Sequence, residues 1–180
     1  RAEAYARAVR QIENPRLAVM NLGAEEGKGT GLIQRSRDLI AATPGINFTG
    51  FSEGREFFDG AADVVVTDGF VGNAVLKMAE GLAKSLFSAI AQAIFTEDPE
   101  LALRLEPAIK ALYAKSDYEE LGGAPLLGVN GTYIIGHGSS KAKTIAASIR
   151  NGFEYIRLGL NDVMTARIAE VEASMDATAV

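Results

Sequence analysis

The chain has 180 residues, of which 48% are hydrophobic and 23% charged, a composition typical of a folded globular protein rather than a disordered segment. This length fits a single domain with a sizeable core. A formal net charge of −5 without any Lys/Arg stripe argues against a nucleic acid partner. The chain has no cysteine, which excludes disulfides, thiolate metal sites and a cysteine nucleophile and fits a cytoplasmic protein.

The amino-terminal segment RAEAYARAVR predicts an amphipathic helix and not a secretory signal. No apolar run of the sequence is long enough to span a membrane. Because the chain begins at Arg1, without a methionine and directly in a helix, we expect it to be a fragment of a longer protein.

Hydrophobic periodicity predicts strands that alternate with helices along the chain. In the first half we expect a helix, a strand, a helix, a strand, a short helix and a strand, at residues 2–12, 16–22, 30–42, 46–49, 52–60 and 63–67. In the second half we expect a helix from Asn73, a helix from Pro99 to Lys115 kinked at Pro107, a strand over 132–135 and a long final helix that continues through Gly152. This order predicts an α/β fold of three layers, αβα, with a mainly parallel sheet and a projecting helical hairpin at about 82–116.

Polar and glycine-rich loops follow three of the expected strands. They begin at Asn21, at Thr67 and at Gly136. In parallel sheets ligands bind beyond the carboxyl ends of the strands, so we expect these three loops to converge at one rim.

The segment VVVTDGFVGNAVLKMAEG, from Val64 to Gly81, suits a phosphate. Gly69 and Gly72 let backbone amides approach a ligand, Asn73 is a good N-cap, and Lys77 follows one turn later. The alternative is a tight turn in which Asp68 caps backbone amides and Lys77 is solvated. Spacing alone favours that structural interpretation, because short glycine motifs often occur by chance.

The segment GHGSS holds His137, the only histidine, so any imidazole acid–base chemistry falls on this residue. The alternative is a hydrogen-bonded spacer, with Ser139 or Ser140 as the N-cap of the next helix. No nucleophile-elbow pattern accompanies it, and no acyl-serine intermediate is expected. The loop with Glu25, Glu26 and Lys28 is either a lid or a solvated turn, and no motif predicts a bound metal.

The helices between 73 and 116 carry more apolar residues than one core-facing stripe requires. We expect the core-facing stripe to consist of Leu76, Ala79, Ala83, Leu86 and Ile90, and a second apolar face to consist of Phe87, Ala91 and Phe95. A second face indicates a partner, with a second subunit as the first candidate and a membrane surface as the second. Lys84, Arg104 and Lys110 suit anionic headgroups, whereas the acidic TEDPE segment opposes strong attraction.

Four segments occur in the order of a known family: NLGAEEGKG, ADVVVTDGFVGNAVLKMAEG, ELGGAPLLGVNG and GHGSS. Together they resemble the bacterial phosphate acyltransferase family of phospholipid synthesis, over its carboxyl-terminal half only. The resemblance implies that residues 1–180 are the carboxyl-terminal part of an α/β acyltransferase domain. The element GN-xxx-K is also similar to phosphotransacetylases, which implies the phosphotransacetylase/isopropylmalate-dehydrogenase-like fold.

The resemblance implies a cofactor-independent transferase of fatty acid and phospholipid metabolism that moves a long-chain acyl group from acyl carrier protein to inorganic phosphate. It implies a cytoplasmic homodimer with peripheral membrane contact through the hairpin. Catalytic roles fall to Lys77, His137 and Asp68: Lys77 grips phosphate, His137 or a neighbouring amide stabilises the thioester oxyanion or protonates the leaving thiolate, and Asp68 orients amides. Substrate-binding roles fall to Asn21, Gly23, Gly69, Gly72, Asn73, Gly138, Ser139 and Ser140.

Two other functions remain open from the sequence. One is a phosphotransacetylase-type enzyme that acts on a small acyl-CoA. The other is a non-catalytic half that serves dimerisation and membrane contact.

Overall fold

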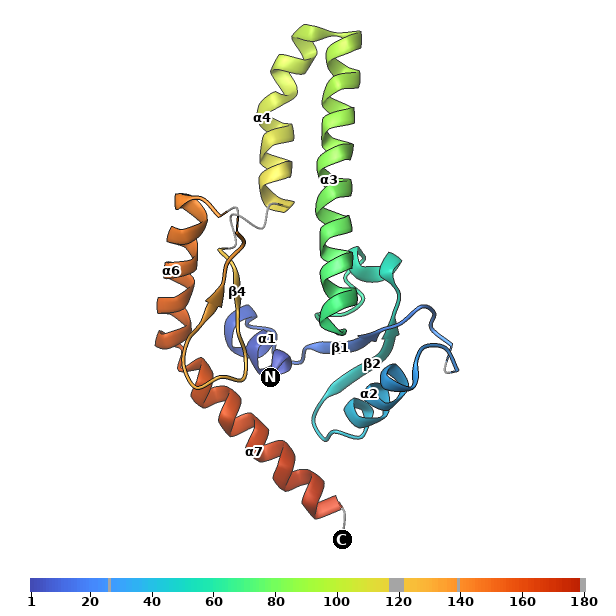
Figure 1. The fold of residues 1–180 in the computed structure, drawn as a ribbon, viewed down its shortest axis with the longest axis vertical. Helices are drawn as coiled ribbons and strands as arrows, with labels where there is room; N and C mark the ends of the chain where they lie inside the picture. Colours follow the sequence, from blue (N-terminus) through green and yellow to red (C-terminus); the bar gives the residue numbers. More distant parts are fainter. Residues whose placement is uncertain (26, 117–121, 139, 179–180) are drawn as a thin grey trace. The chain divides into compact units, whose positions relative to one another are not determined.

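The computed structural model describes residues 1–25, 27–116, 122–138 and 140–178 (Figure 1). The chain divides into two compact units. Unit 1 consists of Arg1–Asp68, Pro125–Tyr133 and Gly152–Val180. Unit 2 consists of Gly69–Ala124 and Ile134–Asn151.

Unit 1 contains a three-stranded parallel sheet with the strand order β2-β1-β3. The strands are β1 (Arg16–Met20), β2 (Asn47–Ser52) and β3 (Val64–Val66). The central strand β1 buries three consecutive residues, Leu17, Ala18 and Val19, as expected for a strand covered on both faces. The predicted α/β class and its parallel sheet are confirmed.

Three helices accompany this sheet: α1 (Ala2–Arg10), α2 (Gly31–Ala41) and α7 (Leu160–Thr178). Helix α2 contacts β1 and β2, while α1 contacts β3 on one side and α7 on another. The buried carboxylate of Glu3 joins α1 to α7, since it pairs with Arg7 of its own helix and, at 3.3 Å, with Arg167 of α7. A buried charge needs such partners, so these pairs hold the two helices in register.

Strand β2 is longer than predicted because it contains a bulge. Leu17 pairs with Phe48 and Val19 pairs with Phe51, so β2 has one residue more than β1 over this stretch. Gly50 lies in the extra segment with a φ of 95°, a left-handed conformation that glycine adopts at little cost. The bulge breaks the alternation of side chains, and the expected end of the strand at residue 49 was therefore wrong.

An ion pair ties the start of β1 to the residue before β3. The Asp63 carboxylate accepts from the Arg16 backbone amide at 2.8 Å and from its guanidinium at 3.0 and 3.1 Å. These bonds hold the pKa of Asp63 below its usual value. A lowered carboxyl pKa stabilises the fold at higher pH, and this contribution is lost as the pH falls below about 3.8 toward the folded-state pKa.

We therefore expect Asp63→Asn to be less stable than the parent chain at pH 7. Its free energy of unfolding should also fall less steeply between about pH 4 and pH 2, because the titrating group is gone. Urea unfolding followed across this pH range measures both effects. An unchanged pH dependence would show that the pair contributes nothing to the acid sensitivity of unit 1.

Unit 2 contains a hairpin of two long helices, α3 (Gly69–Glu97) and α4 (Pro99–Ser116), which run side by side (Figure 1). Asp98 joins them, and its carboxylate accepts from the Leu101 amide at 3.0 Å. Pro107 lies inside α4, and a kink at this residue stays a prediction. Among the described residues, no helix combines the length and the apolar character needed to cross a bilayer.

The expected core-facing stripe of α3 was wrong for Leu76, Leu86 and Ile90, which are 62%, 55% and 41% exposed. Its other two members, Ala79 and Ala83, are half-buried, as are Phe87 and Ile94. A single partner helix covers only a narrow stripe of α3, so apolar residues outside that stripe face solvent in this chain. Phe87 consequently leaves the predicted second face, while Ala91 and Phe95 remain exposed on it.

The carboxyl-terminal elements differ from the sequence prediction in two ways. The last strand, β5 (Ile134–Ile135), pairs with β4 (Ala124–Pro125) in a separate two-stranded sheet and does not extend the parallel sheet. The final helix is divided into α6 (Ala142–Arg157) and α7. The break lies at Gly159, whose φ of 59° ends α6 although the apolar periodicity continues past it.

Candidate active site

Two chemically distinctive side chains of unit 2 meet. Lys77 lies in the third turn of α3, and His137 lies in the loop after β5, 60 positions further along the chain. The Lys77 Nζ and the His137 Nε2 are 3.2 Å apart. The structure thus brings together the two residues that carried most of the chemistry expected from the sequence.

The contact fixes the direction of the hydrogen bond. A lysine ammonium has three donors and no acceptor, so the Lys77 Nζ donates and the His137 Nε2 accepts. In the neutral imidazole the proton then resides on Nδ1, which is the donor of the ring. Lys77 contributes a positive charge and His137 contributes one oriented N–H at the same place.

Glu80 is a third member of this cluster, and the sequence analysis missed it. Its Oε2 accepts from the Lys77 Nζ at 3.0 Å. The three-residue spacing places Lys77 and Glu80 on the same side of α3, and this spacing was the available signal. Glu80 and His137 together restrict a side chain that otherwise has four rotatable bonds.

The loop around His137 is closed by its own hydrogen bonds. The His137 amide donates to the Ser140 Oγ at 3.1 Å, and the Ser140 amide donates to the His137 carbonyl at 3.0 Å. Ser140 therefore closes this turn. Its predicted role as N-cap of the next helix was wrong, because α6 begins two residues later at Ala142. A Cβ added at Gly138 would meet no atom within 4 Å, so the loop is open at this point. Ser139 lies outside the described residues.

The glycines before Lys77 belong to the helix and not to a loop. Helix α3 already begins at Gly69, and neither Gly69 nor Gly72 has a positive φ. The first amides of a helix lack an intrahelical acceptor, so the Gly69 amide is a donor that suits an anion, whereas the Gly72 amide lies four residues after Asp68 and donates within the helix. A substrate-binding role for Gly72 stays a prediction. Asn73 follows Gly72 within the helix, and its predicted role as N-cap was wrong. Asp68 directly precedes the helix.

The remaining predicted residues belong to unit 1. The Asn21 side chain is buried, donates to the Lys28 carbonyl at 3.0 Å and accepts from the Leu22 amide at 2.8 Å. It thereby shapes the loop that contains Gly23, where Lys28 also pairs with Glu25 at 2.6 Å. A substrate-binding role for Asn21 and Gly23, and the convergence of this loop with those at Asp68 and His137, stay predictions.

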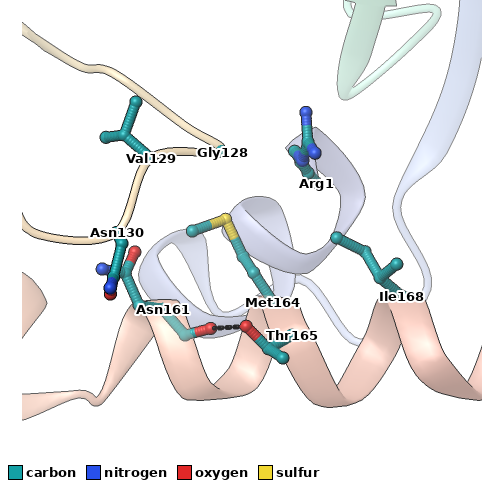
Figure 2. Close-up of a pocket in the computed structure, with 8 residues that line it drawn as sticks. All are labelled: Arg1, Gly128, Val129, Asn130, Asn161, Met164, Thr165 and Ile168. Carbon is teal, nitrogen blue, oxygen red and sulfur yellow. Dashed lines mark hydrogen bonds between the residues drawn. The ribbon is translucent and has the colours of Figure 1, made fainter.

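Unit 1 also contains a cavity of about 260 Å³, between the 128–130 loop, Arg1 and α7 (Figure 2). Met164 and Ile168 line it together with Asn130 and Asn161. Arg1 is the only titratable side chain of its lining, and no residue predicted from the sequence contributes to it. The cavity therefore offers less chemistry than the Lys77–His137 contact. Within the described part of the chain, no three His, Asp or Glu side chains gather in a way that could hold a metal.

The fold and this contact define an α/β protein with a lysine–histidine site at the base of a helical hairpin. A family model described as "Fatty acid synthesis protein" matches residues 2–163, so the chain belongs to that family.

Known relatives agree with this assignment. The chain is 43% identical over 159 residues to the phosphate acyltransferase of Dictyoglomus turgidum, covering 87% of this chain and 47% of the relative. It is 43% identical over 172 residues to that of Geotalea daltonii, covering 93% and 49%. It is 39% identical over 175 residues to that of Campylobacter jejuni, covering 95% and 52%. The chain spans about half the length of the curated relatives it matches.

Proposed function

We propose that this chain is the carboxyl-terminal part of a phosphate acyltransferase. In this proposal the full-length enzyme transfers a long-chain fatty acyl group from acyl carrier protein to inorganic phosphate, forming acyl phosphate for phospholipid synthesis. The names of the relatives and the family support acyl transfer. The single observation that carries the proposal here is the 3.2 Å contact between Lys77 and His137, because it joins a fixed cation to an oriented donor.

The reaction needs an anion to be held in line with a carbonyl. A phosphate oxygen attacks the thioester carbon, the new C–O bond forms, the C–S bond breaks, and the thiolate leaves with the electron pair and takes up a proton. Phosphate is already a nucleophile, so catalysis depends mainly on positioning and on stabilisation of developing charge. No covalent intermediate with the enzyme is required.

The proposed roles follow from the donors of unit 2. Lys77 and the first amides of α3, including that of Gly69, attract the phosphate. Gly72 lets the backbone of the first helical turn approach the phosphate closely. The His137 Nδ1–H donates to the thioester oxygen or to the leaving sulfur, since its Nε2 accepts from Lys77. Gly138 leaves room for the substrate beside this ring. Asp68, directly before α3, orients the amides of the helix start.

The exposed apolar residues of the hairpin support two further proposals, a homodimer and a peripheral contact with the membrane. Leu82, Leu86 and Leu112 are 71%, 55% and 54% exposed. Exposed apolar surface of this kind favours a partner. In this proposal the enzyme is cytoplasmic and lies at the membrane surface, and acyl carrier protein is the partner that delivers the acyl group.

The test uses the full-length protein with either long-chain acyl carrier protein or acetyl-CoA. We expect loss of the acyl carrier protein thioester that depends on phosphate and yields acyl phosphate. Preferential use of acetyl-CoA would instead identify a phosphotransacetylase-type enzyme. Activity that survives the loss of both Lys77 and His137 would leave this half with a structural role only.

A further inference from the structure

A groove of about 510 Å³ lies between the two helices of the hairpin. Its apolar lining consists of Ala91, Ile94, Phe95, Ala102, Leu103 and Ile109. The lining residues Glu106 and Lys110 form an ion pair of 2.5 Å, so their charges compensate one another. The volume is within the range of ~300–1,000 Å³ that is usual for ligand sites.

The groove opens on the side of α3 that carries Lys77. Phe95 follows Lys77 by 18 residues, which is about five turns at ~3.6 residues per turn, so both side chains leave the helix in the same direction. Lys84, Ser88 and Ala91 deviate from this direction by about 40° or less. One face of α3 therefore changes along its length from Lys77, which is paired with Glu80, and Lys84 to the apolar groove residues Ala91 and Phe95.

This change in character matches one kind of ligand, an amphiphile with an anionic head and a long apolar tail. We propose that the groove binds the distal carbons of the acyl chain while its carbonyl or acyl phosphate group is held at Lys77 and His137. The inference rests on the proposed function and assigns the site that distinguishes long from short chains. In this arrangement the lysines lie beside the phosphate or carbonyl end of the ligand, and the apolar groove lies beside the far end of its hydrocarbon chain.

The distances along the helix set the chain length that the groove can distinguish. With a rise of ~1.5 Å per residue, Ser88 lies about 16 Å and Ala91 about 21 Å beyond Lys77. An extended chain with C–C bonds of ~1.5 Å advances about 1.3 Å per bond, so sixteen to eighteen carbons extend about 19–22 Å and twelve extend about 14 Å. Chains of sixteen carbons or more therefore reach the groove, and chains of twelve carbons do not.

The test fills the groove with Ala91→Trp in the full-length protein. Acyl carrier proteins loaded with chains of eight to eighteen carbons serve as substrates. We expect kcat/KM for the sixteen- and eighteen-carbon chains to fall about tenfold, with that for the ten-carbon chain unchanged. Ala93→Trp is the matched control: it is exposed on α3, points about 160° away from Lys77 and is absent from the lining, and it should leave the chain-length profile unchanged.

A direct binding measurement separates this inference from the proposed function. A fluorescent eighteen-carbon fatty acid should bind the parent protein and Ala93→Trp, and it should bind Ala91→Trp at least about tenfold more weakly. If the parent forms no acyl phosphate, the proposed function fails while this binding still tests the groove. Equal losses at all chain lengths, or a change only in dimer mass by light scattering, would overturn the inference and assign the groove to a second copy of the chain.

Discussion

Replacement of Lys77 by methionine in the full-length protein should lower kcat/KM for acyl-phosphate formation by about 10²–10³-fold. Methionine keeps the unbranched shape of the side chain but removes the ammonium that donates to the His137 Nε2 and attracts phosphate. The Lys77 side chain is 47% exposed and methionine fills a similar volume, so the loss of packing is small and the protein should fold normally. Phosphate-dependent consumption of long-chain acyl carrier protein measures the effect.

Two substitutions of His137 distinguish its possible roles. His137→Gln can place an amide oxygen near the position of Nε2, so it can still accept from Lys77. His137→Ala removes the acceptor and the ring together. If His137 mainly orients Lys77, glutamine should restore much of the activity that alanine loses, whereas a role in proton transfer through Nδ1 predicts equal losses for both variants.

Arg150→Ala provides the control for a general change in charge. Arg150 is an exposed cation of the same unit, on α6, and has no place in the proposed site. Its loss should leave the kinetics unchanged. If Lys77→Met resembled Arg150→Ala, the lysine–histidine contact would have no part in catalysis, and the proposed function would lose the observation that carries it.

The sequence contained enough information to predict the sheet of unit 1 but not its irregularities. In the run RLAVM four apolar residues follow Arg16, and Pro15 precedes the run, so it predicted the central strand directly. Gly50 and Gly159 both adopt positive φ, one inside a strand and one between two helices. Periodicity measures only which faces are apolar. It continues across Gly159 and so hid the helix break, and it is interrupted at Gly50 and so hid the second half of β2. Their conformations depend on hydrogen bonding that local patterns do not determine.

The candidate site was predicted as separate residues and not as an arrangement. Lys77 and His137 were each identified from their segments, but their contact joins positions 60 residues apart and requires tertiary packing. The start of α3 was placed at Asn73 because asparagine is a good N-cap and the glycines before it suggested a loop. Asp68, an equally good N-cap residue, directly precedes the observed start at Gly69. Both signals were present, and the wrong one was chosen.

Gly122→Ala should destabilise unit 2 by about 3 kcal/mol, the largest effect on stability that we expect from a single methyl group. Gly122 is buried with a φ of 82°, and a Cβ at this position would lie 2.5 Å from the Ser148 amide nitrogen and 2.6 Å from the Ala147 carbonyl carbon. Left-handed strain contributes ~1–2 kcal/mol and overpacking ~1–3 kcal/mol. The atoms that would be met are backbone atoms of α6, which cannot rotate away as a side chain can.

Gly60→Ala separates the two contributions. Gly60 has a φ of 67°, but a Cβ there would meet no atom within 4 Å, so only the conformational strain of about 1 kcal/mol should remain. Urea unfolding gives the free energies of unfolding. Because the two units need not unfold together, hydrogen exchange of the α6 amides is needed to assign the loss of stability to unit 2. The Ser148 Oγ also donates to the Gly122 carbonyl at 2.8 Å, which fixes α6 shortly after the His137 loop. Gly122→Ala should therefore increase the hydrogen exchange of the α6 amides and also reduce acyl-phosphate formation. If Gly122→Ala and Gly60→Ala destabilised the protein equally, Gly122 and α6 would not approach as closely as the structure shows.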